Sequence, residues 1–509
     1  MPVSLAVHGS TTALRPSRTQ SFSVVLLIEL WERFGYYGMQ AILLLFMVQQ
    51  LGFRDRQANL LWGAFAALTY TAPAVGGWIG DQVLGSRRTM LMGAMTLALG
   101  YLFMSLPVGG TLLLYLAMGT ITIGNGMFKS NAANMVRRIY DGDDSKLDGA
   151  FTIYYMAVNV GSTVSILLCP WLKDRYGWHV AFATCCAGLL VGLANYAVMH
   201  RRVDHIGSPP DAQPLRPERL AAVLGGVLVA IAAVTFVLQH PDIARACVWL
   251  AALVVVAVWI WSFRGSAASE RPGLLMMYLL TLEAMLFFIF YQQMSTSLTL
   301  FALRNVRLDF TLGGTPLFHW SAGQFQALNP IWIMLASPPL AWLYNRLGAT
   351  KRDLSLAGKF LLGFACVAGG FLIWWLCCRA STSPQVSPWV MVWGYLLLSL
   401  GELLVSGLGL AVAARYVPSR IGAFMMGSYF LAVGVAMYLG SMVANMAALP
   451  DLGGATDPAQ SLPLYTTLFF RLFLLACGGT LLFALLLPIT RRLDVAHQRG
   501  PAGGRLSRP

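Results

Sequence analysis

The stretch RRVDHIGSPPDAQPLRP, residues 201–217, sets the organisation of this chain. It is polar, and its four prolines prevent a continuous helix. Six long apolar segments precede it, two follow it, and six more begin after Pro272. We therefore expect a linker and an inserted helical hairpin between two six-helix halves.

The composition places the apolar segments in a membrane. The 509 residues are 57% hydrophobic and 11% charged, with a mean hydropathy of +0.65, whereas soluble domains carry about 25% charged residues. A membrane-spanning helix takes roughly 20 apolar residues, so little length remains for an extramembrane domain. We expect an all-α polytopic membrane protein, which excludes a soluble enzyme. Its fourteen expected helices cover residues 22–50, 58–83, 89–106, 111–136, 150–171, 179–200, 218–238, 243–263, 273–299, 321–347, 354–379, 388–415, 420–447 and 463–491.

These helices divide the chain into five expected regions. They are an N-terminal segment (1–21), an N-terminal bundle (22–200), a linker with the inserted hairpin (201–272), a C-terminal bundle (273–491) and a tail (492–509).

The positive charge indicates the orientation in the membrane. Most of the 35 Lys and Arg residues lie in loops on the side of both termini, and such an excess marks the cytoplasmic face. We therefore expect both termini to be cytoplasmic, and we attribute the net charge of +14 to topology rather than to a nucleic-acid partner. The first apolar run is too long for a signal peptide and lacks a cleavage site after it, so we expect it to be retained.

Ionisable residues within the expected helices are the main functional candidates. Each costs about 2.5–3.5 kcal/mol on insertion scales and usually faces an interior cavity. Glu29, Glu32 and Arg33 lie three and four residues apart, so one helix face carries two acids and one base. The alternative is a charge cluster that only holds helices together. Burying charges seldom stabilises a protein more than apolar packing would. The remaining candidates are Lys129, Glu283 and Glu402.

Lys129 and Glu402 occupy the fourth helix of the first and second half, respectively. Pseudo-symmetry would place them on opposite walls of one central cavity. A zwitterion would satisfy both poles, with its amine near Glu402 and its carboxylate near Lys129 and Arg33. The alternatives are snorkelling of Lys129 to the interface and, for Glu283, a buried protonated acid or a packing partner.

Four acids and two bases leave this interior with an excess of two negative charges, which a net-neutral substrate cannot cancel. Burial and nearby like charges favour the neutral form of a carboxyl, so we expect one or two of these acids to exchange protons near neutral pH. The sequence therefore predicts proton-coupled transport.

Several motifs resemble the proton-dependent oligopeptide transporter family of the major facilitator superfamily, along nearly the whole chain. They are ELWERFGYY (29–37), GGWIGDQVLGSRR (76–88) and FTIYYMAVNVGS (151–162). Residues 291–297, 328–330 and 401–407 are most similar to the bacterial dipeptide and tripeptide permease branch. The resemblance implies a major facilitator fold, a multi-pass protein of the bacterial inner membrane and symport of protons with dipeptides and tripeptides.

The resemblance also implies roles for individual residues. Proton coupling would involve Glu29, Glu32, Arg33, Glu402 and Glu283. Substrate binding would involve Arg33, Tyr36, Tyr37, Lys129, Tyr155, Asn159, Asn329, Glu402 and Ser406. Gating would involve Asp81, Arg87 and Arg88.

The sequence departs from the family pattern at three places. Ser130 and Ser295 stand where proline is usual, and Gln293 stands where other branches have an acid. These departures leave substrate preference and the ion pairing of the outer gate open.

Three other function classes remain as alternatives. A related carrier could move amino acids, other small zwitterions, anions or drugs. An intramembrane transferase would need a histidine or metal constellation in the spans, and a channel would need a repeated filter-like loop; neither is seen in the sequence. We expect no enzymatic activity, no metal and no cofactor. The expected partners are peptides, protons and membrane lipid, and no oligomer is implied.

Overall fold

The computed structural model describes residues 16–107, 110–349, 356–449 and 457–499, and within α13 it leaves the side chains of 406–414 undescribed. The N-terminal half and the inserted hairpin contain α1 (Arg18–Leu45), α2 (Asp55–Trp78), α3 (Ser86–Ser105), α4 (Thr111–Ile139), α5 (Asp144–Tyr176), α6 (Trp178–Met199), α7 (Pro217–Gln239) and α8 (Pro241–Arg264). The C-terminal half contains α9 (Arg271–Tyr291), α10 (Ser297–Asn305), α11 (Leu328–Ala349), α12 (Leu356–Ala380), α13 (Trp389–Tyr416), α14 (Ser419–Ala444) and α15 (Pro458–Arg499), with strands β1 (Asp309–Leu312) and β2 (Thr315–His319).

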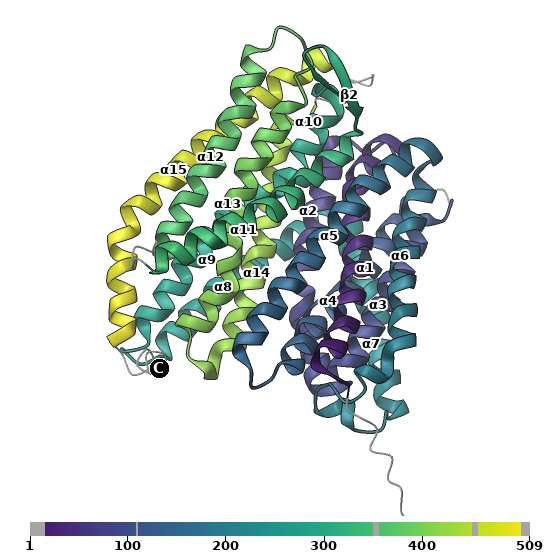
Figure 1. Cartoon of the computed structure of the whole chain (residues 1–509), viewed down its shortest axis with the longest axis vertical. Coiled ribbons are helices and arrows are strands. Elements are labelled where there is room, and N and C mark those ends of the chain that lie inside the picture. Colours follow the sequence, from purple (N-terminus) through teal and green to yellow (C-terminus); the bar gives the residue numbers. More distant parts are fainter. Residues whose placement is uncertain (1–15, 108–109, 350–355, 450–456, 500–509) are drawn as a thin grey trace, which may run out of the picture.

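The helices form two bundles that lie side by side (Figure 1). In the N-terminal half, α1 packs on α5 and α6, and α3 and α4 pack together; in the C-terminal half, α12 packs on α13 and α15. The start of α1 and the end of α15 lie at the same end of the molecule, here called the inner end (Figure 1). The β-hairpin lies at the opposite, outer end.

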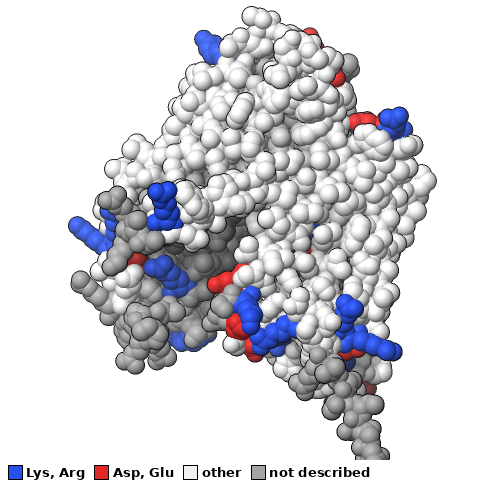
Figure 2. All heavy atoms as spheres, viewed as in Figure 1, with Lys and Arg blue, Asp and Glu red and all other residues white. Residues whose placement is uncertain are grey.

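Nine helical segments of the described chain are long and apolar enough to cross a membrane by length and composition alone. The helix α1 fails that criterion because every 18-residue window within it contains Glu29, Glu32 and Arg33. Figure 2 shows a broad uncharged belt across one face, with Lys, Arg, Asp and Glu gathered toward the two ends. This belt is the surface that a lipid bilayer would cover.

The prediction of one continuous helix over 273–299 was wrong. The helix α9 ends at Tyr291, a 3-10 turn covers Gln292–Ser295, and α10 begins after Thr296, whose backbone is not helical (φ −122°, ψ −97°). Counting α9 and α10 as one interrupted helix, the described chain has the expected fourteen long helices in the expected order. The interruption places polar side chains of the turn beside the interface of the two halves.

Other parts of the chain also differ from expectation. The helix expected over 321–347 begins at Leu328, because Ala322–Ala327 form a 3-10 helix. The segment after α10 forms the β1–β2 hairpin, whose turn residues Gly313 and Gly314 have positive φ of 57° and 87°, a conformation that glycine adopts readily. The last helix extends beyond 463–491 to Pro458–Arg499, and its final turns pack on the end of α13 through a hydrogen bond from Tyr416 Oη to Asp494 Oδ1 (2.8 Å).

The inserted hairpin contacts both halves. The helix α7 packs on α4 of the first half, where a Cβ on Gly119 would lie 2.6 Å from Thr235 Oγ1. The helix α8 packs on α14 of the second half, where Trp259 Nε1 donates to Ser428 Oγ (3.3 Å). The outward side chains Leu228 and Leu253 are 69% and 67% exposed, which suits a lipid-facing surface.

Candidate functional site

Three charged residues on α1 form a buried cluster. Arg33 Nε lies 2.5 Å from Glu32 Oε2 and 3.1 Å from Glu29 Oε1. All three residues are at most 4% exposed, and Asn125 on α4 donates to Glu32 Oε1 (3.3 Å). Arg33 Nη2 has no hydrogen-bond partner among the described residues. The guanidinium therefore retains a donor for a further acceptor.

Close helix packing positions Lys129 opposite this cluster. A Cβ on Gly126 of α4 would lie 2.6 Å from Ala72 Cβ, so only a residue without a side chain lets α4 approach α2 here. One turn along, Lys129 Nζ lies 5.2 Å from the centre of the Tyr70 ring. Arg33 and Lys129 line the same cavity, here called the basic lobe.

A second cavity, here called the acidic lobe, is lined by Glu402 of α13 and Asn329 of α11. Asn329 Nδ2 donates to Glu402 Oε2 (2.7 Å) and to Ser399 Oγ (3.1 Å). The bond from Asn329 fixes the position of one carboxylate oxygen of Glu402. Tyr155 and Asn159 of α5 line the same lobe from the N-terminal half.

The two lobes meet in one chamber between the halves. Both are lined by Tyr37, Gln40, Tyr291 and Ser295. The structure thus brings Arg33, Lys129 and Glu402 around one space with a positive and a negative pole. Toward the inner end the surface is hollowed between the halves (Figure 2).

The remaining residues of the expected site lie as follows. Tyr36 lines the basic lobe with Tyr37. Glu283 is buried on α9 (2% exposed) and lines neither lobe, and its Oε2 has no hydrogen-bond partner among the described residues. The side chain of Ser406 lies outside the described residues.

The expected gating residues lie at the inner end of the N-terminal half. Asp81 Oδ1 lies 3.3 Å from Arg138 Nη2. Arg88 donates to the linker carbonyls of Pro210 (3.1 Å) and Gln213 (2.8 Å), and Arg87 donates to that of Val203 (3.2 Å). These contacts tie the start of α3 to the linker; a role in gating stays a prediction.

An ion pair that the sequence did not indicate lies at the outer end. Arg304 of α10 binds Asp55 of α2 through Nη1–Oδ2 (2.6 Å) and Nη2–Oδ1 (2.7 Å), and Tyr465 Oη accepts from Arg304 Nη1 (3.4 Å). Beside it, Asn59 Nδ2 donates to Asn445 Oδ1 (3.0 Å). These bonds join the two halves, so the outer end is closed while the inner end is hollowed. Asp55 and Arg304 fell in loops or at helix ends, where charges are ordinary, so no sequence signal distinguished them.

Comparisons with known proteins agree with this architecture. The sequence profile of the POT family matches residues 87–458. The chain is 41% identical over 480 residues to dipeptide and tripeptide permease B of Salmonella typhimurium, covering 93% of this chain and 95% of the relative. It is 39% identical over 475 residues to dipeptide and tripeptide permease A of Klebsiella pneumoniae, covering 93% of each.

Solved structures give the same result. A crystal structure of tetrameric PepTSo2 superposes with a TM-score of 0.86 at 51% identity, covering 94% of this chain and 100% of that one. A structure described as a bacterial homologue of the human drug peptide transporters PepT1 and PepT2 superposes with a TM-score of 0.85 at 52% identity, with the same coverage. The chain therefore belongs to the POT family, and its fold is that of the major facilitator transporters, as expected.

Proposed function

We propose that this protein is a transporter that imports dipeptides and tripeptides together with protons. The observation that carries the proposal is the chamber between the two halves, which is positive at Arg33 and Lys129 and negative at Glu402. The protein is a carrier rather than an enzyme. Family membership and relatives named dipeptide and tripeptide permeases support the peptide substrate.

The two poles suit a short peptide with free termini. The peptide carboxylate would accept from Arg33 Nη2 and pair with Lys129, and charge-assisted bonds of this kind are about twice as strong as neutral ones. The peptide ammonium would pair with Glu402, whose Oε2 is already oriented by Asn329. Side chains of the peptide would lie against Tyr37 and Tyr291, which line both lobes.

Proton coupling follows from competition for Arg33. While Glu29 and Glu32 are ionised, both lie within 3.1 Å of the guanidinium and hold it. Protonation of either acid weakens that hold and frees Arg33 for the peptide carboxylate. Proton loss restores the internal pair and favours release. The acids supply the negative charge that hydrogen ions neutralise, so no cofactor is required.

Alternating access would occur by rocking of the two halves around the chamber. In the described state the outer end is closed by Arg304 and Asp55, and the inner end is hollowed. We infer that the inner end, which carries the start of α1, the end of α15 and the basic groups Arg87, Arg88 and Arg138, faces the cytoplasm of a bacterial inner membrane.

The test is uptake of a labelled dipeptide by proteoliposomes, with and without an imposed proton gradient. Unlabelled single amino acids, dipeptides, tripeptides and tetrapeptides compete in parallel. We expect gradient-driven accumulation and competition by dipeptides and tripeptides only. Accumulation that ignores the gradient would contradict proton coupling, and competition by single amino acids would identify a carrier of other zwitterions.

A further inference from the structure

The inserted hairpin is the place where the chain crosses from the N-terminal half to the C-terminal half. The linker before α7 is bonded to the N-terminal half, since Ser208 Oγ donates to Gly80 O (2.6 Å) and accepts from Ser86 N (2.8 Å). The segment after α8 is bonded to the C-terminal half, where Glu270 pairs with Arg420 of α14. The crossing therefore lies between these two segments, within α7 and α8.

The helix α7 packs as part of the N-terminal half, and Figure 1 shows it beside that bundle. Its Val227 and Ile231 are buried in an apolar cluster with Met92 of α3 and Met127 of α4. Every residue of that cluster belongs to the N-terminal half or to α7. A Cβ on Gly119 of α4 would lie 3.1 Å from Ile231 O, so the backbones of the two helices approach closely here. Separation of α7 from this half would lose that packing.

The helix α8 packs instead as part of the C-terminal half. The Trp259 ring stacks on that of Tyr278 of α9, with the ring centres 4.8 Å apart, and Tyr278 Oη donates to Trp259 O (2.9 Å). Trp259 Nε1 also donates to Ser428 Oγ of α14 (3.3 Å). The Trp261 ring lies edge-on to that of Phe424 of α14, with the ring centres 5.5 Å apart. Ring contacts and hydrogen bonds thus hold α8 on α9 and α14.

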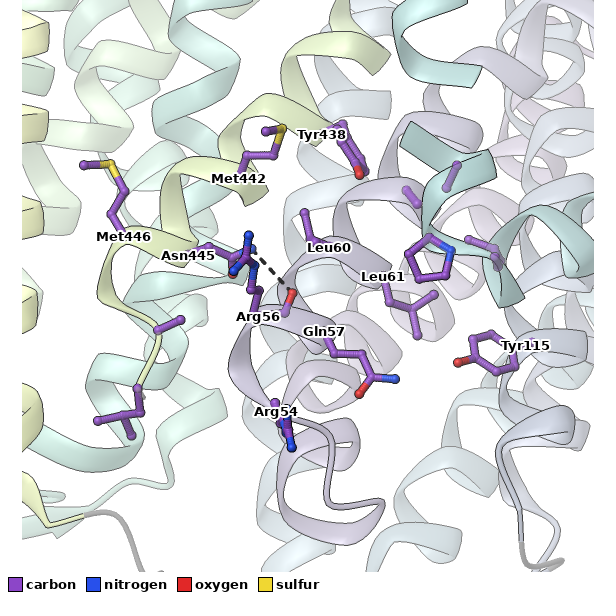
Figure 3. A pocket seen from close by; sticks show the side chains of 16 residues that line it. Arg54, Arg56, Gln57, Leu60, Leu61, Tyr115, Tyr438, Met442, Asn445 and Met446 are labelled. Atoms are coloured by element: carbon purple, nitrogen blue, oxygen red, sulfur yellow. Dashed lines mark hydrogen bonds between the residues drawn. The ribbon is translucent and has the colours of Figure 1, made fainter. Parts of the chain in front are cut away.

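A single residue joins α7 to α8 at the outer end. The helix α7 ends at Gln239 and α8 begins at Pro241, and His240 between them is extended (φ −117°, ψ 91°). Pro241 lines the cavity drawn in Figure 3, together with Arg56 at the start of α2 and Asn445 just after α14. The two halves are joined there by a hydrogen bond from Asn445 Nδ2 to Arg56 O (3.4 Å) (Figure 3). This bond can break when the outer end opens, whereas the joint at His240 is covalent and persists.

We propose that the hairpin α7–α8 is a covalent tether that limits opening of the outer end. The tether rests on the proposed alternating access: when the two halves separate at the outer end, α7 goes with one half and α8 with the other. Each residue spans at most about 3.5 Å, so the Cα atoms of Gln239 and Pro241 can lie at most about 7 Å apart. A wider separation must unwind a helix end or break the packing of α7 or α8 on its half. The tether therefore disfavours the outward-open state and favours the described one.

The direct test lengthens the joint in the full-length protein by inserting Gly-Ser-Gly-Ser after His240. Spin labels on Gln57 of α2 and on Arg307 just after α10, two exposed positions, report the outer-end distance. We expect the distance distribution to shift toward the longer, outward-open distance, because the longer joint no longer limits the separation. The control inserts the same residues after Gly265, between α8 and α9, which pack in the same half, and should leave the distribution unchanged. The Tm of each variant shows whether it is folded.

A second measurement needs no insertion. Spin labels on Arg219 of α7 and Arg264 of α8, both exposed near the inner end, report the distance between the inner ends of the hairpin helices. In Arg304→Gln, which breaks the outer ion pair, we expect this distance to shorten as the outer end opens, because the inner ends of the two halves approach.

Two results would overturn the tether while leaving alternating access intact. One is a constant distance between Arg219 and Arg264 while the outer end opens, which would show that the hairpin moves as one body. The other is a folded insertion variant whose outer-end distribution matches that of the wild type. An outer end that stays closed in every variant would instead contradict alternating access itself, and the tether with it.

Discussion

Arg304 and Asp55 form a buried, bidentate ion pair that joins the C-terminal half to the N-terminal half at the outer end. The two bonds are 2.6 and 2.7 Å long, and the side chains are 4% and 5% exposed. A buried pair of this kind is costly to break on one side only, because the remaining charge then has no partner. In the proposed cycle this pair must separate each time the chamber opens outward.

Loss of this pair should therefore favour the outward-open state. For Arg304→Gln we expect the closed outer end to be destabilised by about 3–5 kcal/mol, the usual cost of removing one partner of a buried pair. The measurement is the outer-end distance between spin labels on α2 and α10. Arg307→Gln, an exposed cation near the end of α10, is the control. The charge-reversed double variant Asp55→Arg, Arg304→Asp should recover part of the closed population, and an unchanged distance in Arg304→Gln would contradict a gating role.

Glu32→Gln should uncouple the protein from the proton gradient. Glu32 is fully buried and lies 2.5 Å from Arg33, and an amide at this position cannot exchange a proton. We expect proton-driven accumulation of a dipeptide to vanish, while exchange of labelled for unlabelled peptide across the membrane persists. The exposed acid Glu218 provides the control variant Glu218→Gln. Accumulation that survives in Glu32→Gln would place the coupling elsewhere.

Lys129→Ala should weaken transport of peptides that have a free carboxylate. Hydrogen bonds to charged groups contribute about 1.5–3 kcal/mol, so we expect the apparent affinity to fall roughly 10–100-fold. A dipeptide amide, which lacks that charge, should be much less affected by the substitution. Lys146→Ala is the surface control, since Lys146 pairs with Asp143 outside the chamber. Equal losses for the free acid and the amide would show that Lys129 supports the fold instead of the carboxylate.

Glu402→Gln should reduce discrimination for a free amino terminus. Glu402 is 9% exposed, and Asn329 binds only one of its oxygens in the described structure. We expect weaker competition by ordinary dipeptides and a smaller difference between them and their N-acetylated forms. Competition assays on the wild type, Glu402→Gln and Glu402→Asp provide the measurement. A discrimination ratio that does not change in Glu402→Gln would exclude this residue from binding the amine.

Much of the site could be predicted because ionisable residues are rare in membrane-spanning segments, and the site is built from such residues. Glu32, Arg33, Lys129 and Glu402 stand out in apolar segments, and the insertion cost of each is large. The positions of Lys129 and Glu402 on corresponding helices of the two halves then indicated a shared chamber. For Glu283 the sequence left open a buried protonated acid or a packing partner, because its cost of burial is the same whether it lines a cavity or lies among packed helices.

The interruption between α9 and α10 could not be predicted from composition. Residues 274–291 are mainly apolar, and the mainly polar stretch that follows, 292–297, carries no charge, so composition alone favoured one span. The break at Thr296 depends on packing at the junction of the halves. The outer ion pair was hidden because Asp55 and Arg304 lie 249 residues apart and each occupies a position where a charge is unremarkable.

The sequence by itself determined the membrane class, the two halves with their inserted hairpin and the charged residues of the interior. These features follow from the free energy of transferring each segment from water into hydrocarbon, which depends on the composition of that segment. Only the tertiary structure decided that Arg304 meets Asp55, that Glu283 lies outside the chamber and that the inserted hairpin packs on α4 and α14. These depend on how the helices are rotated and tilted against one another, and that arrangement is fixed by packing among distant segments.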